Sequence, residues 1–180
     1  DGNSIYEVFD ENIACDIRLN DALEHNLVVP FHYFGISDIQ SIDYENIDLN
    51  KIDELAKLLS VNKRADFIIE KMNFYSFFGT KRKAIGFCVS KEHAFFMSEK
   101  FNEKGINSLC LTSEDSIQKR EETIKKLEDE KDPLEVIFTV DIFNEGIDIP
   151  KINTVLFLRP TNSPIVFVQQ LGRGLRKYKN

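Results

Sequence analysis

The chain has 180 residues, of which 42% are hydrophobic, and its formal net charge is -7. This length supports one main hydrophobic core with at most a small appendage. No run reaches the roughly 18 consecutive apolar residues of a membrane span, and no basic and then apolar leader opens the chain, so we expect a cytoplasmic protein with no membrane partner. Because the sequence opens at Asp1 without a methionine, we also expect it to be part of a longer protein.

The cysteines and histidines do not form a metal-binding pattern. Three cysteines, an odd number, occur without a CxxC spacing, and the three histidines are not spaced as ligands relative to one another or to cysteine. We therefore predict buried thiols, with neither a disulfide framework nor a metal site.

The first 80 residues are the least regular part of the chain. Two stretches rich in apolar residues are predicted as strands on either side of a short helix, and two later stretches have apolar residues at helical spacing. The strands are expected at 14–20 and 28–36, the short helix at 21–26, and the later helices within 47–59 and 65–78.

From residue 84 onward, short apolar runs alternate with helical segments. The runs predict strands at 84–89, 106–112, 134–140 and 153–158. Strands that are apolar throughout and alternate with helices are typical of an α/β fold, a doubly wound parallel sheet with helices on both faces. In such a fold, ligands bind at the carboxyl ends of the strands.

The helices between these strands have recognisable ends. Ser90 is expected to cap the first of them and Gly105 to end it. Ser113 or Ser116 can cap the second, and Pro133 is expected to close it. These two helices are predicted at 91–104 and 118–130.

The charge is distributed unevenly. From Ile149 onward there are six basic residues and no acidic one, so the first 148 residues hold all 30 acidic side chains against 17 basic ones. A segment of one sign on a body of the other indicates a local anion site, and the alternative is a solvated basic tail.

The stretch VQQLGRGLR, residues 168–176, concentrates two of these basic residues on a predicted helix. Gln169, Arg173 and Arg176 fall within an arc of roughly 60° beside an apolar stripe. Gly172 and Gly174 each cost the helix about 1 kcal/mol relative to alanine, which favours close approach of a ligand or backbone. Arginine suits a phosphate because its planar fork donates two parallel hydrogen bonds. The alternative is the surface end of a helix, where cations interact with the carbonyl dipole.

A second motif precedes this stretch and decides between the alternatives. TVDIFNEGIDIP followed by QQLGRGLR resembles motifs V and VI, here residues 139–150 and 169–176, of superfamily 2 helicases and translocases related to restriction-type enzymes. The similarity is strong from about residue 83 to 176. It implies the C-terminal RecA-like helicase domain over 51–180, preceded by an interdomain lead-in segment over 1–50.

The resemblance also implies roles at a nucleotide. Arg176 would be an arginine finger that reaches the γ-phosphate of ATP bound on another domain, with Arg173 beside it as a second catalytic residue. Such an arginine stabilises the charge that develops on the transferred phosphoryl group. The remaining nucleotide-binding residues would be Gln169, Gly172, Gly146 and Asp148. For Asp148, a turn carboxylate before a proline is the competing interpretation.

Nucleic-acid contacts are implied at the ends of the predicted strands. Ser90, Thr112 and Thr139 carry hydroxyls there, where the resembling family grips phosphates. Taken singly, each is also an ordinary N-cap or turn residue. Thr139 is one position away from the threonine of the family pattern, so Asn144 is a further candidate. Gln169 and Gln170 stand where RNA helicases of the DEAD-box type have His-Arg, which favours DNA as the substrate.

Two sequence elements needed for ATP hydrolysis are not in the chain. There is no G-x-x-x-x-G-K-[ST] loop, since GTKRK at 79–83 lacks the earlier glycine, and there is no D-E-x-H box to hold magnesium. We therefore expect the second motor domain of an ATP-dependent DNA helicase or translocase, whose N-terminal RecA-like partner domain holds most of the ATP and Mg²⁺. A non-catalytic nucleotide-binding module and a protein-interaction module on the same fold are the alternatives.

Overall fold

The computed structural model describes residues 24–25, 28–40, 42, 48, 51–75, 77, 79–140, 151–160, 170 and 172. Its helices and strands follow one another as α3 (Ile52–Leu59), α4 (Asn62–Phe74), β1 (Ala84–Phe87), α5 (Lys91–Glu103), β2 (Ser108–Leu111), α6 (Ile117–Glu128), β3 (Val136–Thr139) and β4 (Thr154–Phe157). All four predicted strands are present, each a few residues shorter than the sequence indicated.

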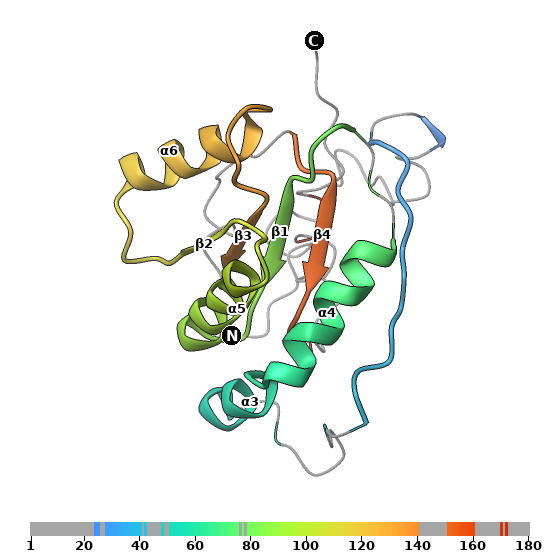
Figure 1. Cartoon of the computed structure of the whole chain (residues 1–180), viewed down its shortest axis with the longest axis vertical. Helices are drawn as coiled ribbons and strands as arrows, with labels where there is room; N and C mark the ends of the chain where they lie inside the picture. The colour runs from blue at the N-terminus through green and yellow to red at the C-terminus, as the bar shows by residue number, and fades with distance from the viewer. Residues whose placement is uncertain are drawn as a thin grey trace, which may run out of the picture.

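The four strands form one parallel sheet in the order β2-β3-β1-β4. The register aligns their ends, because Thr139 at the end of β3 pairs with both Phe87 and Leu111, and Phe87 also pairs with Phe157. Consecutive strands in a parallel sheet need crossover connections, and α5 and α6 supply them here. The carboxyl ends of the strands therefore lie along one edge, toward which the arrows of β1 and β4 point in Figure 1.

Helices cover both faces of this sheet. On one face, α4 and α5 pack against a core cluster of Ala65, Ile69, Met72, Ala84, Cys88, Ala94, Met97, Phe101, Ile106, Val136, Phe138 and Leu158. On the other face, Ile124 and Leu127 of α6 pack against Ile85 and Ile137 of the central strands. Successive side chains of a strand point to opposite faces, so an apolar strand fills both clusters. The predicted α/β doubly wound class is confirmed.

A glycine in the central strand makes the first of these clusters possible. A Cβ added at Gly86 would lie 2.5 Å and 2.7 Å from two ring carbons of Phe138 on the neighbouring strand. The Phe138 ring is fully buried and meets Phe101 edge-to-face, with centroids 4.8 Å apart. Gly86 thus provides the space in which a phenylalanine can lie across β1.

The predicted helix caps are mostly confirmed. The Ser90 hydroxyl accepts a hydrogen bond from the His93 amide, and of the two serines considered for α6 it is Ser116 that caps the helix. Gly105 follows α5 with a φ of 78°, in the left-handed region that glycine adopts without penalty. Pro133 does not close α6, because the helix ends at Glu128 and leaves the proline in the following loop.

The lead-in segment differs from the prediction. Residues 28–36 contain no strand, although their apolar residues resemble one. Pro30 lacks an amide hydrogen, and the ring of Phe34 stacks on Tyr75 just after α4, so the segment meets the end of this helix through a ring contact and not through a ladder. The strand expected at 14–20 lies outside the described residues, as does most of the helix expected at 21–26.

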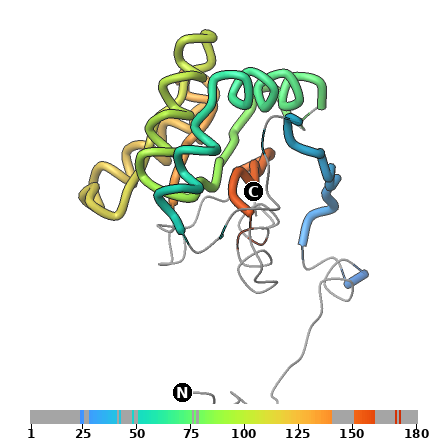
Figure 2. The backbone as a smooth tube through the Cα atoms, turned by 90° about the horizontal axis from the view of Figure 1, so that it is seen from below, coloured from blue at the N-terminus to red at the C-terminus, as the bar shows by residue number. Residues whose placement is uncertain are grey.

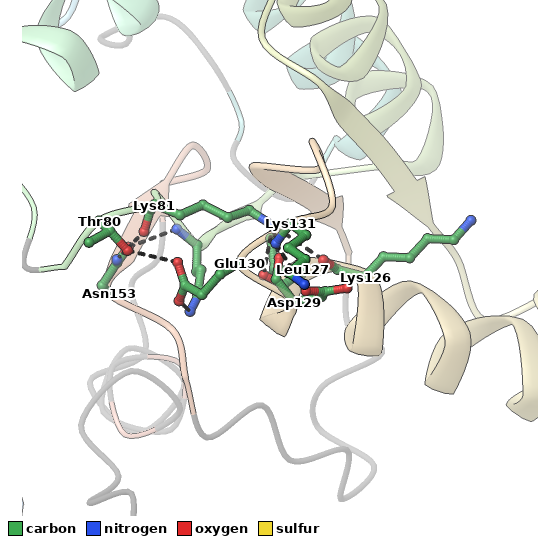
Figure 3. Close-up of polar contacts among 9 residues, drawn as sticks. Thr80, Lys81, Lys126, Leu127, Asp129, Glu130, Lys131 and Asn153 are labelled. Atoms are coloured by element: carbon green, nitrogen blue, oxygen red, sulfur yellow. Dashed lines mark hydrogen bonds and ion pairs between the residues drawn. The ribbon is translucent and has the colours of Figure 1, made fainter.

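The loop GTKRK at 79–83 contacts the end of α6, as Figure 3 shows. The Lys81 Nζ donates to the backbone carbonyls of Lys126, Leu127 and Asp129, at 3.3, 3.3 and 2.7 Å. Cations in this position satisfy carbonyls that the helix leaves without partners. Lys83 pairs with Glu130, which also accepts from the Thr80 hydroxyl at 2.8 Å. Both lysines of this loop are thereby engaged where β1 begins, at the opposite edge from the strand carboxyl ends.

Candidate functional site

The strand carboxyl ends bring three predicted nucleic-acid contacts to one edge of the sheet. Thr139 is the last residue of β3, Thr112 directly follows β2, and Ser90 comes three residues after β1. Their strands are adjacent and end in register. All three residues are less than 10% exposed.

Ser90 is committed to the start of α5. Its hydroxyl accepts from the His93 amide at 3.2 Å, which satisfies one of the amides that a helix leaves without partners at its first turn. The backbone amide of Glu92 and then the Ser90 hydroxyl lower the pKa of the exposed Glu92 carboxyl. Capping and phosphate contact use the same local geometry, since both rely on groups at a helix N-terminus.

Thr112 belongs to a hydrogen-bonded turn centred on Asp115, a residue that the sequence prediction missed. The backbone amide and the hydroxyl of Thr112 both donate to Asp115 Oδ2, at 2.7 and 3.2 Å. Burial alone would raise the pKa of Asp115, but hydrogen bonds from Lys119 and Thr112 together outweigh it and lower that pKa. A Thr-x-x-Asp spacing after a predicted strand is the signal that could have indicated this turn.

Thr139 differs from the other two hydroxyls. It is 0% exposed, and its Oγ1 has no hydrogen-bond partner among the described residues. Its backbone carbonyl accepts from the Cys88 amide at 2.7 Å, which holds the end of β3 against β1. A buried hydroxyl without a partner costs on the order of 1 to 3 kcal/mol, so a group with this geometry is expected where a ligand or another segment supplies the bond.

A buried guanidinium lies at the same edge and was not predicted. Arg64 of α4 is 5% exposed. It donates from Nε to Asp38 at 2.7 Å and from NH2 to the Leu158 carbonyl at 3.2 Å, and its NH1 lies 3.5 Å from Nε2 of His93. Four segments of the chain therefore meet at one side chain.

His93 is neutral in this surrounding. Burial lowers its pKa to about 3, and the positive charge of Arg64 acts in the same direction. Its Nδ1 lies 3.4 Å from the Val89 amide. A neutral imidazole accepts at only one of its nitrogens, so it bonds to either Arg64 or Val89 and not to both.

Cys88 and Cys110 are the two cysteines that the structure describes. Cys88 is buried and Cys110 is half-buried, neither is in a disulfide, and burial raises the pKa of Cys110 to about 11. Cys15 lies outside the described residues. Within the part of the chain that the structure describes, no three His, Cys, Asp or Glu side chains are grouped so that they could hold a metal ion.

The predicted nucleotide-facing residues lie mostly outside the described residues. This applies to Arg173, Arg176, Gln169, Gly146 and Asp148, and to Asn144 among the predicted nucleic-acid contacts. Gly172 is described, and a Cβ added to it would meet no atom of the described residues within 4 Å. The described residues therefore give no packing reason for glycine there, and the approach of a ligand stays a prediction.

A parallel sheet with helices on both faces and polar groups gathered at its carboxyl edge defines the class of the chain, a RecA-like domain of superfamily 2 helicases. The family model described as the helicase conserved C-terminal domain matches residues 50–178. The chain belongs to this family.

Among the described residues, no helix combines the length and the apolar character needed to cross a membrane.

Curated relatives include a protein named as a helicase and a restriction enzyme subunit. The chain is 27% identical over 173 residues to the putative ATP-dependent helicase IRC3 of Saccharomyces cerevisiae, which covers 96% of this chain and 23% of that protein. It is 29% identical over 106 residues to the type I restriction enzyme EcoKI endonuclease subunit of Escherichia coli, covering 53% of this chain and 9% of that protein. The chain thus spans less than a quarter of each of these two relatives.

Solved structures agree in fold. A fragment of a putative HsdR subunit of a type I restriction enzyme from Vibrio vulnificus YJ016 superposes with a TM-score of 0.56 at 21% identity, over 75% of this chain and 27% of that one. The yeast DEAD-box splicing factor Prp28 gives a TM-score of 0.52 at 16% identity, over 63% and 24% of the two chains. At these identities the likeness establishes the fold alone.

Proposed function

We propose that the chain is the second motor domain of an ATP-dependent DNA helicase or translocase. Three hydroxyl-bearing residues at the carboxyl edge of one sheet, in a helicase C-terminal domain, carry this proposal. In it, residues 1–50 are the interdomain lead-in and residues 51–180 the motor domain. The ATP-dependent helicase named among the relatives supports the same reading.

The proposed chemistry is completed by a neighbouring domain. A P-loop domain of the parent protein holds ATP and Mg²⁺, and this chain contributes Arg176 as arginine finger with Arg173 beside it. Hydrolysis then occurs only when the two domains close, because the positive charge reaches the γ-phosphate only in the closed state. Gln169, Gly172, Gly146 and Asp148 hold the nucleotide from this side.

The nucleic-acid half of the proposal uses the strand ends. Ser90, Thr112 and Thr139, with Asn144 as a further candidate, contact phosphates of the DNA backbone. Hydroxyls and helix N-termini position a backbone without reading its sequence, which suits a motor that moves along any DNA. Opening and closing around ATP would then move the two domains relative to each other along the strand.

The test joins this chain to a P-loop domain and measures DNA-stimulated ATP hydrolysis. Arg173→Ala and Arg176→Ala are expected to abolish most of the turnover, while Lys125→Ala is the control because Lys125 is exposed in the last turn of α6. Unchanged turnover in the arginine variants rejects the assignment. ATP binding by the chain alone would favour a regulatory nucleotide-binding module instead, and a joined protein with no salt-dependent DNA binding would favour an interaction module.

A further inference from the structure

The lead-in segment runs along α4 and is fixed at one end by a buried ion pair. We call residues 28–40 the strap; it is the blue trace that passes beside α4 in Figure 1 and the blue segment at the right of Figure 2. Asp38 of the strap accepts from Arg64 at 2.7 Å, with side-chain exposures of 18% and 6%. The other oxygen of Asp38 accepts from the Ile39 amide at 2.9 Å. This bond fixes the orientation of the carboxylate that faces Arg64.

A second contact, near the middle of the strap, is aromatic. Phe34 stacks on Tyr75, with ring centroids 4.0 Å apart and planes 23° from parallel. Tyr75 directly follows α4, whereas Arg64 lies in its first turn. The strap therefore runs antiparallel to α4 and is attached to both ends of that helix.

The attachment at Arg64 is the less exposed of the two. Phe34 is 47% exposed, whereas the side chains of Asp38 and Arg64 are 18% and 6% exposed.

Arg64 connects that attachment to the edge of the sheet. Its NH2 group donates to the carbonyl of Leu158, whose own amide donates to the Phe87 carbonyl at 3.0 Å. Leu158 directly follows β4 and lies eleven positions before Gln169 in the sequence. The buried guanidinium cannot lose one partner cheaply, because an uncompensated buried charge is costly.

We propose that Arg64 is a positioning residue that couples the strap to the carboxyl edge of the sheet, by holding Asp38 and the Leu158 carbonyl on one guanidinium. A shift of the strap then displaces Leu158, where the segment that leads to Gln169, Arg173 and Arg176 begins. The hydrogen bonds from Arg64 to Asp38 and to the Leu158 carbonyl support the structural coupling. Its effect on ATP hydrolysis rests on the proposed function.

The coupling is tested by amide hydrogen exchange of the 180-residue chain. Asp38→Asn retains an oxygen for the Ile39 amide but replaces the oxygen that faces Arg64 with a donor. Asp66→Asn is the matched control, because it makes the same change on α4 in an exposed pair with Lys104. We expect Asp38→Asn to speed exchange about 10- to 100-fold both within the strap and at residues 155–158, as for the loss of a charged hydrogen bond. We expect Asp66→Asn to leave both segments unchanged.

Three results would overturn the coupling. Faster exchange in the strap alone would show that Asp38 is a local anchor whose loss does not reach Leu158. Equal effects of Asp38→Asn and Asp66→Asn would show a general loss of stability. Arg64→Lys retains the charge without the planar fork, and it must accelerate exchange in the same two segments as Asp38→Asn for the proposal to hold.

The role in the motor has a separate readout. In the parent protein joined to its P-loop domain, Asp38→Asn is expected to lower the kcat of DNA-stimulated ATP hydrolysis about 10- to 100-fold, with the KM for ATP unchanged. An unchanged kcat together with coupled exchange restricts Arg64 to the fold and overturns its positioning role. Absence of DNA-stimulated hydrolysis in the wild-type protein counts against the proposed function and leaves the exchange result intact.

Discussion

Replacement of Gly86 by alanine tests how tightly the central strand is packed. The added Cβ would lie 2.5 Å from a Phe138 ring carbon, about 1 Å or more inside the normal carbon separation of about 3.5 to 4.0 Å. The ring cannot move away freely, because it is fully buried and packed edge-to-face on Phe101. Alanine also meets a Leu158 methyl at 3.5 Å, which is an ordinary contact.

The expected net effect is a loss of stability. Overpacking in a close-packed core costs about 1 to 3 kcal/mol. The lower chain entropy of alanine in the unfolded state offsets roughly 0.4 to 1 kcal/mol of this. We therefore expect Gly86→Ala to lower the free energy of unfolding by about 1 to 2 kcal/mol, measured as a lower urea midpoint at unchanged m-value.

A second substitution separates steric overlap from backbone effects. Phe138→Leu in the Gly86→Ala background removes the ring, so the double variant should lose less stability than the two single variants added together. Additive losses, or a Gly86→Ala variant as stable as the wild type, would refute the packing argument.

Further predictions concern Lys81 at the end of α6, the hydroxyls of Thr139 and Thr112, and the buried histidine. Lys81→Met removes the donor to three carbonyls at the end of α6 and should lower the free energy of unfolding by about 1 kcal/mol, measured by urea denaturation. Thr139→Val should leave stability unchanged or higher, since Oγ1 has no described partner, whereas Thr112→Val breaks the bond to Asp115 and should lower it; the same assay compares them. If Thr139 contacts phosphate, Thr139→Val in the joined protein also weakens DNA binding in a salt titration. The pKa of His93 is about 3 in the folded chain and near 6.5 in the unfolded chain. Between these pH values the unfolded state binds more protons than the folded state. The free energy of unfolding therefore falls as the pH decreases. Between pH 6 and 5, above the carboxyl range, His93→Gln should therefore flatten the stability curve by up to about 1.4 kcal/mol per pH unit, and an identical slope would contradict the burial of a neutral ring.

The sheet and its helices could be predicted because their signals are local. Runs such as AIGFCV and LEVIFTV are apolar at every position, as strands buried on both faces must be, and Ser90 and Gly105 mark helix ends through the chemistry of single residues. Residues 28–36 misled the prediction, because aromatic side chains that pack on a helix look the same in sequence as those of a strand. Pro133 misled it because a proline ends a helix only where the helix has not already ended.

The candidate site was predictable in part. Alternating strands and helices imply a common carboxyl edge, so Ser90, Thr112 and Thr139 could be expected there from sequence. Arg64 could not, because its partners lie 26, 29 and 94 residues away and only the folded chain brings them together. Asp115 is a different case, because its partner Thr112 is only three positions away and the Thr-x-x-Asp spacing after a strand was a local signal that the prediction did not use.

The most direct test of the account is the single-turnover rate of ATP hydrolysis by this chain joined to a P-loop domain, with DNA present. Arg176→Ala is predicted to lower this rate about 10³- to 10⁵-fold, as for other arginine fingers, while nucleotide affinity changes little. A rate equal to that of the wild type would contradict the claim that this domain supplies a positive charge to the transferred phosphate.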